Sequence, residues 1–494
     1  MTRAHSATEI CFLPATELAA RIRRRDLSPV EVVDAYLARI GERNPVINAY
    51  TLVLADKARA AAKAAENAVM AGGSLGPLHG VPVAIKDMDD VAGVPTSMGS
   101  LAIKNYVPKT STILVQRWLA AGAIILGKTN TPEFGHKGIT DNPRFGPTST
   151  PYAIGRNAGG SSGGSAAAIA DGLAALAQGT DGGGSVRIPA SFSGCVGFKP
   201  SFGRIPSVTR PDGHLWSRPL VHLGPLARTV GDAALATQVA AGPHGRDPLS
   251  LPDQGINFRA ATGQAASRLR IAYSPRLGSF PVDPAVAAVV RDAVNALAAS
   301  GFTVEEHEPR IGPHHSELAA LWIRTVAVHY AAIADYLKCN GIDLLGEQNA
   351  VLTEDFRALL DMGRGIGAVD HMKEDVLRTQ VLDALEDVFE TFDVIVSPTM
   401  AVPPVINGTD GLTRGPQTIN GETVDPLIGF CMTYPINYTG HPAISVPAGL
   451  TPDGLPIGLQ VIGRRHDDMT VLAMAAAVER LRPWFDTYPG LRAG

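Results

Sequence analysis

Residues 159–189 read GGSSGGSAAAIADGLAALAQGTDGGGSVRIP, and this stretch decides the fold class. Two Gly/Ser loops enclose a segment of helical character over 165–177 and the strand-like run ALAQGTDG. Upstream, the apolar runs VPVAIK and AIILGK flank a helical pattern over 112–121. Because strand and helix patterns alternate, the sequence predicts an α/β sheet.

The same organisation extends toward both ends of the chain. Near the start, Ser28-Pro29-Val30-Glu31 has the pattern of a capping box that opens an amphipathic helix. Near the end, FDVIVSPT, HPAISVPAG and PIGLQVIG predict three strands, and a closing helix follows. We predict a single large domain over 1–494, with a helical region at 1–75, a catalytic core at 76–245, a variable pocket-covering region at 310–420, and C-terminal strands with a helix at 421–494.

The composition excludes several classes of function. Of the 494 residues, 45% are hydrophobic and 18% are charged, which is typical of a chain with much buried surface. The formal net charge of −4 argues against a nucleic-acid partner. The four cysteines show no C-x-x-C spacing, so we expect neither a disulfide framework nor a zinc site. We find no apolar leader or membrane span, and we expect a cytoplasmic protein.

The two Gly/Ser loops carry the residues best suited to chemistry. Glycine permits close approach and positive φ, so each loop can turn several backbone N–H groups toward one oxyanion. The serines within them are natural nucleophiles, but no histidine stands near either loop to act as a base. In VPVAIK both faces of the strand are apolar, so Lys86 ends a buried strand. Burial would lower the pKa of Lys86 and make the amine a usable base.

Together these segments resemble the amidase signature family. The resemblance covers most of the chain through GVPVAIKD, GKTNTPEFG, residues 159–200 and the tail from NYTGHPAISVPAG to LQVIG, all in the family's order. It implies the family's fold, which is a large twisted mixed β-sheet flanked by helices on both faces. It also implies a hydrolase of linear or cyclic carbon–nitrogen amide bonds, similar to general, aryl-acyl and cyclic-oligoamide amidases.

The resemblance assigns a role to each matched residue. Ser185 would be the acylating nucleophile, Ser161 the bridging serine and Lys86 the base, and the Gly160–Ser161 peptide would be cis. The amides of the loop at 182–185 would form the oxyanion hole, which places Gly182, Gly183 and Gly184 in the site. We expect Asp181 and Arg187 to hold this loop, although Arg187 could reach a substrate carboxylate.

Other residues are assigned less directly. We expect Gly135, Thr140 and Asn142 to line the substrate pocket, and Lys128, Thr129, Asn130 and Glu133 to pack the fold. Thr150, Gly182 and Gly183 depart from residues common in the family, which leaves the pocket's detail open. We expect no cofactor and no metal ion, and a small-molecule amide as the partner. A homodimer stays open, as does the identity of the amide.

Three alternatives compete with this interpretation. Residues 159–164 satisfy G-x-S-x-G twice, so an α/β-hydrolase with an esterase triad is possible if His441 or His466 reaches Ser161 or Ser162. The amidase-type component of a transfer-RNA-dependent amidotransferase would use the same three residues, although such components usually have Gln where this chain has Ile188. A catalytically silent binding protein is the third alternative, and the intact Lys86, Ser161 and Ser185 argue against it.

Overall fold

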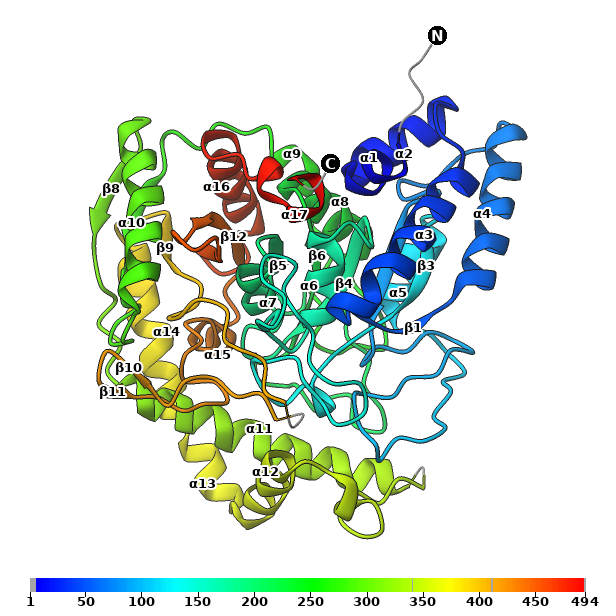
Figure 1. The fold of residues 1–494 in the computed structure, drawn as a ribbon. Coiled ribbons are helices and arrows are strands. Elements are labelled where there is room, and N and C mark those ends of the chain that lie inside the picture. Colours follow the sequence, from blue (N-terminus) through cyan, green and yellow to red (C-terminus); the bar gives the residue numbers. More distant parts are fainter. Residues whose placement is uncertain (1–5, 340, 410–411, 493–494) are drawn as a thin grey trace.

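A computed structural model describes residues 6–339, 341–409 and 412–492. Within these residues, eleven strands form one sheet in the order β1-β3-β2-β4-β6-β5-β12-β13-β9-β7-β8 (Figure 1). Their bounds are β1 (Tyr50–Val53), β2 (Pro82–Lys86), β3 (Ile124–Thr129), β4 (Leu176–Asp181), β5 (Val196–Lys199), β6 (His222–Ala227), β7 (Arg270–Tyr273), β8 (Thr303–Glu306), β9 (Val394–Pro398), β12 (Ala443–Leu450) and β13 (Pro456–Gly463). A separate hairpin contains β10 (Thr418–Ile419) and β11 (Glu422–Thr423).

The sheet is mixed, as predicted. Strands β3, β2 and β4 run parallel to one another, and so do β8, β7 and β9. The strands between β4 and β9 are joined antiparallel. Every residue of β2, β6 and β13 is buried, so both faces of the sheet are covered along these strands. The predicted fold class is therefore confirmed.

Helices surround the sheet (Figure 1). They are α1 (Ala7–Phe12), α2 (Ala15–Arg24), α3 (Pro29–Ile47), α4 (Ala55–Met70), α5 (Ile113–Ala120), α6 (Gly163–Ala170), α7 (Arg187–Phe192), α8 (Val230–Ala240), α9 (Phe258–Ala261), α10 (Pro284–Ala299), α11 (His315–Lys338), α12 (Glu354–Gly365), α13 (Ala368–Lys373), α14 (Asp375–Phe389), α15 (Tyr434–Thr439), α16 (Asp468–Leu481) and α17 (Pro489–Arg492). Short 3₁₀ turns lie at Glu133–Gly135, Asn349–Val351 and Phe485–Thr487. The predicted capping box at Ser28 and Glu31 opens α3.

The helix expected over 165–177 is shorter than predicted. It ends at Ala170, because Gly172 adopts a φ of 69° that terminates the helical path. Residues 173–175 then lead directly into β4. Alanine and leucine suit a helix and a buried strand alike, so composition could not place this boundary.

Two hydrophobic clusters lie on either side of α7. The larger cluster joins the N-terminal helices, the sheet and α16, and it includes Val186 and Ala190. The second joins α11, α12, α14 and α15, and it includes Ile188 and Phe192. Alternate residues around α7 therefore enter different clusters. The loop that precedes α7, which holds Ser185, lies where the 310–440 region meets the sheet.

Among the described residues, α11 is the one helix long and apolar enough to cross a membrane by length and composition. Half of its most apolar window is buried inside the fold. Leu318, Leu321 and Trp322 are among its buried side chains, and α12 packs along it. A core helix has the same features, so this property alone indicates no membrane span.

Candidate active site

Lys86 ends β2 and points into the region of the two Gly/Ser loops. Its side chain is fully buried, which the apolar character of both strand faces predicted. Its ammonium nitrogen Nζ lies 2.6 Å from Ser161 Oγ and 2.8 Å from Thr180 Oγ1. Two hydroxyls therefore hold the amine, and one of them belongs to the predicted bridging serine.

The environment of Lys86 favours the neutral amine. Burial lowers the pKa of Lys86 to about 7, although the negative charges of Asp89 and Asp181 act in the opposite direction. Desolvation disfavours the charged form of a buried group, and here it outweighs the attraction of the two carboxylates. A lysine with a pKa of about 7 is half deprotonated at neutral pH and can accept a proton there.

Ser161 lies in a loop that other segments hold closely. The Gly160–Ser161 peptide is cis, as the resemblance implied, and Ser161 is 2% exposed. A Cβ atom at Gly160 would come within 2.6 Å of the Ile139 backbone, and one at Gly135 would lie 3.2 Å from Ser161 Oγ. Thr140 Oγ1 accepts a hydrogen bond from the Gly163 amide at 3.0 Å. Gly135 and Thr140 therefore support the serine loop from one side.

Ser185 lies immediately before α7, against the first Gly/Ser loop. Its backbone carbonyl accepts a hydrogen bond from the Ser162 amide at 3.2 Å. With 8% of its surface exposed, it is the most accessible of the three predicted catalytic residues. Within the described part of the chain its hydroxyl makes no hydrogen bond, to Ser161 or to any other group. Such contacts are often loose in enzymes without bound substrate.

The carbonyls of the 181–184 loop are anchored one after another by other segments. Asn437 donates to Asp181 O at 2.8 Å, Trp322 Nε1 to Gly182 O at 2.9 Å, and Thr433 Oγ1 to Gly183 O at 2.6 Å. The Ile188 amide donates to the Gly184 carbonyl at 2.6 Å. In a trans peptide the N–H points away from the preceding carbonyl, so these anchors fix the directions of the N–H groups that follow.

Gly184 differs from the expectation that its amide faces an oxyanion. Its N–H already donates to Asp181 Oδ1 at 2.8 Å. Across the described residues, the amides of Gly182, Gly183 and Ser185 have no acceptor. The donor set available to an oxyanion is therefore these three amides, without Gly184. Gly184 has a φ of 120°, and a Cβ there would lie 1.9 Å from Thr433 Oγ1, so only glycine fits.

Asp181 and Arg187 form a buried ion pair under this loop. Burial alone would raise the pKa of Asp181, but the charge and hydrogen bonds of Arg187 hold it well below its usual range. Arg187 Nε and Nη2 donate to the Asp181 carboxylate at 3.0 and 2.9 Å. The remaining donors of Arg187 bond to Thr433 O, Gln460 Oε1 and Asn437 Oδ1. All five guanidinium N–H groups are used, so Arg187 holds the loop and has none left for a substrate carboxylate.

A sequence profile of the family described as Amidase matches residues 31–472. The chain belongs to the amidase family. An acylamidase of Rhodococcus erythropolis is 39% identical over 484 residues, with 97% of each chain covered. The crystal structure of a bacterial aryl acylamidase of the amidase signature family superposes with a TM-score of 0.94 at 38% identity, and it covers 98% of this chain and 99% of that one.

Similarity also extends to the amidotransferases. The amidase-type component of the glutamyl-tRNA(Gln) amidotransferase of Anaeromyxobacter dehalogenans is 34% identical over 493 residues, with 96% of this chain and 97% of that one covered. The acylamidases are more similar to this chain at comparable coverage. This amidase therefore hydrolyses amide bonds, and the amidotransferase alternative is the weaker one.

The esterase alternative fails on the positions of its histidines. His441 is fully buried, with its ring stacked on Phe389 and its nitrogens facing Thr439 and Glu386. His466 lies in the turn before α16. Ser162 Oγ pairs with the backbone of Thr180 instead. Within the described residues no histidine hydrogen-bonds to either serine of the first loop.

Asn142 does not present its amide to the pocket, contrary to expectation. Its Nδ2 donates to Asn130 Oδ1 and Thr131 O, and its Oδ1 accepts from the amides of Arg144 and Phe145. These bonds close a buried turn, in which a short amide side chain satisfies the nearby backbone.

The residues expected to pack the fold are all buried. Lys128 Nζ bonds to Asp89 O and Thr96, and Thr129 pairs with Ser165. Asn130 donates to Gly146 O and Thr148, while Glu133 accepts from Ser100 and Thr353.

Four residues of the site were missed by sequence reasoning. Thr180 stands in the quoted stretch, five residues before Ser185, but a strand threonine gives no sign that it will bind a lysine. Trp322, Thr433 and Asn437 come from segments without a readable motif, and only the fold brings them to the loop.

We predict that Trp322→Phe lowers kcat by about three- to tenfold, which corresponds to one neutral hydrogen bond of roughly 1 kcal/mol. The indole N–H holds the Gly182 carbonyl and so directs the Gly183 amide. Steady-state kinetics should resolve kcat from KM. Trp484→Phe is the matched control, because the Trp484 indole also donates to a buried carbonyl, that of Arg228. If both variants lose stability but keep the wild-type kcat, Trp322 has only a structural role.

Proposed function

We propose that this amidase converts a small-molecule carboxamide or N-substituted amide into a carboxylate and ammonia or an amine, through an acyl-enzyme on Ser185. The observation that carries the proposal is the 2.6 Å contact between the buried Lys86 amine and Ser161 Oγ. Ser162, the next residue, donates to the Ser185 carbonyl. An amine that can be neutral near pH 7 thus stands one hydroxyl away from a candidate nucleophile.

In the first half of the reaction, Ser185 Oγ attacks the amide carbonyl carbon. Its proton passes to Ser161 Oγ, while the Ser161 proton passes to the neutral Lys86 amine. The carbonyl oxygen becomes an oxyanion, which the amides of Gly182, Gly183 and Ser185 stabilise by hydrogen bonds. Donors of this kind favour the tetrahedral state over the ground state and contribute roughly 3 kcal/mol each.

In the second half, the tetrahedral intermediate collapses and the carbon–nitrogen bond breaks. Lys86 returns the proton through Ser161 to the leaving nitrogen, so ammonia or an amine departs neutral. Water then attacks the ester carbon with the same relay as base. The carboxylic acid leaves, and the Ser185 hydroxyl is regenerated with its proton.

The surroundings of the loop favour an uncharged, apolar acyl group. A Cβ at Gly183 would touch the Trp322 ring, one at Gly182 would touch Val221, and one at Gly135 would touch Met88. Arg187 has no free donor for an anionic group. The similarity to an acylamidase and an aryl acylamidase points in the same direction, toward linear N-acyl and aryl amides before cyclic ones. We place this activity in the cytoplasm, with residues 310–420 as a wall of the pocket.

Covalent trapping tests the nucleophile. A phosphonate ester that mimics the tetrahedral state should inactivate the enzyme, and peptide mass spectrometry should find the adduct on Ser185. Ser185→Ala should not be labelled under the same conditions. An adduct on Ser162 or Ser165 in active enzyme would contradict the assignment.

A substrate screen tests the reaction class. The purified chain alone should release ammonia from carboxamides or the amine from anilides, and both products should be measured for aliphatic, aryl and indole compounds. Activity without added protein distinguishes a stand-alone amidase from one component of an amidotransferase. If the chain hydrolyses amides only with partner proteins, the second function gains support.

A further inference from the structure

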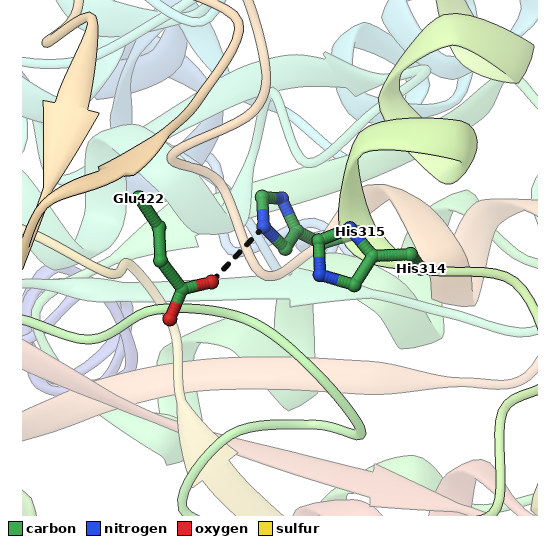
Figure 2. A group of neighbouring side chains, drawn as sticks. All are labelled: His314, His315 and Glu422. Atoms are coloured by element: carbon green, nitrogen blue, oxygen red, sulfur yellow. Dashed lines mark ion pairs between the residues drawn. The ribbon is translucent and has the colours of Figure 1, made fainter.

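Two adjacent histidines at the start of α11 face a glutamate of the β10–β11 hairpin (Figure 2). The segments that carry them are about a hundred residues apart in the sequence, and both lie at the lower left of the molecule in Figure 1. One ligand atom from each of His314, His315 and Glu422 lies within 4.8 Å of the other two. The centroids of the two imidazole rings are 4.1 Å apart.

We propose that His314, His315 and Glu422 bind one divalent transition-metal ion of the zinc class and so link α11 to the β10–β11 hairpin. Two imidazoles and a carboxylate form a donor set that suits zinc and its first-row neighbours, and they leave positions for water. The cysteine spacing gave no sign of such a site, because none of its ligands is a thiolate and the fold brings them together.

His315 has a ring nitrogen without a partner. Its side chain is 1% exposed, and its Nδ1 has no hydrogen-bond partner among the described residues. Its Nε2 lies 3.6 Å from Glu422 Oε2, which is beyond hydrogen-bond distance. Buried polar nitrogens are normally paired, so an imidazole in this state is suited to an additional ligand. Burial lowers the pKa of His315, with smaller effects from His314, Glu422 and Arg276, and this keeps the ring in the neutral form that binds metal.

His314 has one ring nitrogen engaged and the other available. Its Nδ1 lies 3.0 Å from Ser316 Oγ and 3.5 Å from the Ser316 amide. When Nδ1 carries the proton and donates to Ser316 Oγ, Nε2 is left as a ligand atom. A hydrogen bond from the second ring nitrogen commonly orients metal-binding histidines in this way.

Glu422 can complete the site with a small movement. Ligand atoms about 2.0–2.2 Å from a common ion stand closer together than 4.8 Å, so the side chains must close by roughly 1 Å. The Glu422 side chain is 45% exposed and free to do so. Arg276 Nη2 lies 3.5 Å from Glu422 Oε1, whereas His315 faces the other oxygen, Oε2. This exposed arginine is screened by solvent and leaves one carboxylate oxygen for the ion.

The three side chains also border an open surface depression of about 670 Å³, lined in part by Ala319, Ile323 and Asp425. The depression gives an ion in solution a route to the ligands, and it leaves space for water at the remaining coordination positions. Nothing in the proposal involves Ser185, and the metal readouts below do not depend on hydrolysis.

Isothermal titration of the untagged, full-length amidase with zinc chloride tests the site. We expect one saturable zinc site per chain, and an excess of magnesium should not compete, because Mg²⁺ prefers oxygen ligands. Glu422→Gln and His314→Asn should each weaken zinc binding at least tenfold, since even the loss of a residue that supports a ligand costs 10- to 100-fold. Both side chains are exposed, and asparagine can still cap α11, so both variants should fold.

His214→Asn is the matched control, because it removes another exposed histidine and should leave zinc affinity unchanged. Electron paramagnetic resonance of the Cu²⁺-loaded protein gives a second readout, in which two imidazole nitrogens should couple to the copper and only one in His314→Asn. Absence of zinc binding by the wild-type chain would overturn the proposal. Wild-type zinc affinity in both Glu422→Gln and His314→Asn would overturn it as well, because the ion would then lie elsewhere.

Discussion

Ser185→Ala should lower amide hydrolysis by about 10⁴-fold or more, because loss of the nucleophile leaves only the contributions of binding and oxyanion stabilisation. The Ser185 hydroxyl makes no hydrogen bond within the described chain, and Ser185 is 8% exposed. The substitution should therefore change the free energy of unfolding by less than about 1 kcal/mol. Single-turnover rates with an activated anilide, together with thermal unfolding of the same preparation, check both expectations.

Ser162→Ala is the matched control for this prediction. Ser162 lies in the same serine-rich site, but its Oγ bonds only to the backbone of Thr180, away from the Lys86 amine. We expect Ser162→Ala to lose some stability and to keep its rate within about tenfold, since one hydrogen bond contributes roughly 1 kcal/mol. The reverse result, with an inactive Ser162→Ala and an active Ser185→Ala, would move the nucleophile to the first loop.

Much of the fold could be predicted because its strands are short apolar runs bounded by turns. VPVAIK, AIILGK and PIGLQVIG all became strands, and the burial of every residue of β2 follows from its two apolar faces. The order of eleven strands could not be predicted from these patterns. Pairings such as β5 with β12 join segments more than 240 residues apart, and the tertiary fold alone decides which strands meet.

The site divides along the same line between local pattern and distant contact. Lys86 and Ser161 were found because each stands in its own readable motif, and the fold places their polar atoms 2.6 Å apart. Gly184 was misjudged because a glycine run does not reveal which N–H groups are already taken, and here the Asp181 carboxylate takes one. Trp322 could not be found, since its role depends on a helix packing against a loop 140 residues away.

Lys86→Ala should lower the rate by at least a hundredfold, because a general base contributes about 10²–10⁴-fold. Only the neutral amine can accept the proton relayed from Ser185, so the wild-type rate should rise with pH through a single ionisation near the Lys86 pKa of about 7. The rate should then level off above that pH. In Lys86→Ala the residual activity should lack this ionisation, which pH–rate profiles of kcat measure directly.

Two further variants separate the base from a merely buried cation. Lys86→Arg should not restore the rate, because guanidinium remains protonated at every accessible pH. Lys137→Met removes another buried lysine of lowered pKa, one whose Nζ bonds to Thr413 O, and it should keep the pH dependence. A folded Lys86→Ala enzyme with the wild-type profile and more than about a tenth of the rate would refute the assignment, since that loss is too small for a general base.

The same ionisation should be visible in stability, with a definite sign. In the unfolded chain the Lys86 amine titrates near 10.4, whereas in the folded chain its pKa is about 7. Between these two values the unfolded state holds the extra proton, so the free energy of unfolding should rise as the pH is raised from about 7 to 10. Lys86→Met lacks this dependence, and its stability advantage over the wild type should shrink by a few kcal/mol over that range. If the rate and this stability difference begin to change at the same pH, both report the deprotonation of Lys86; if the stability difference stays constant, another group controls the rate.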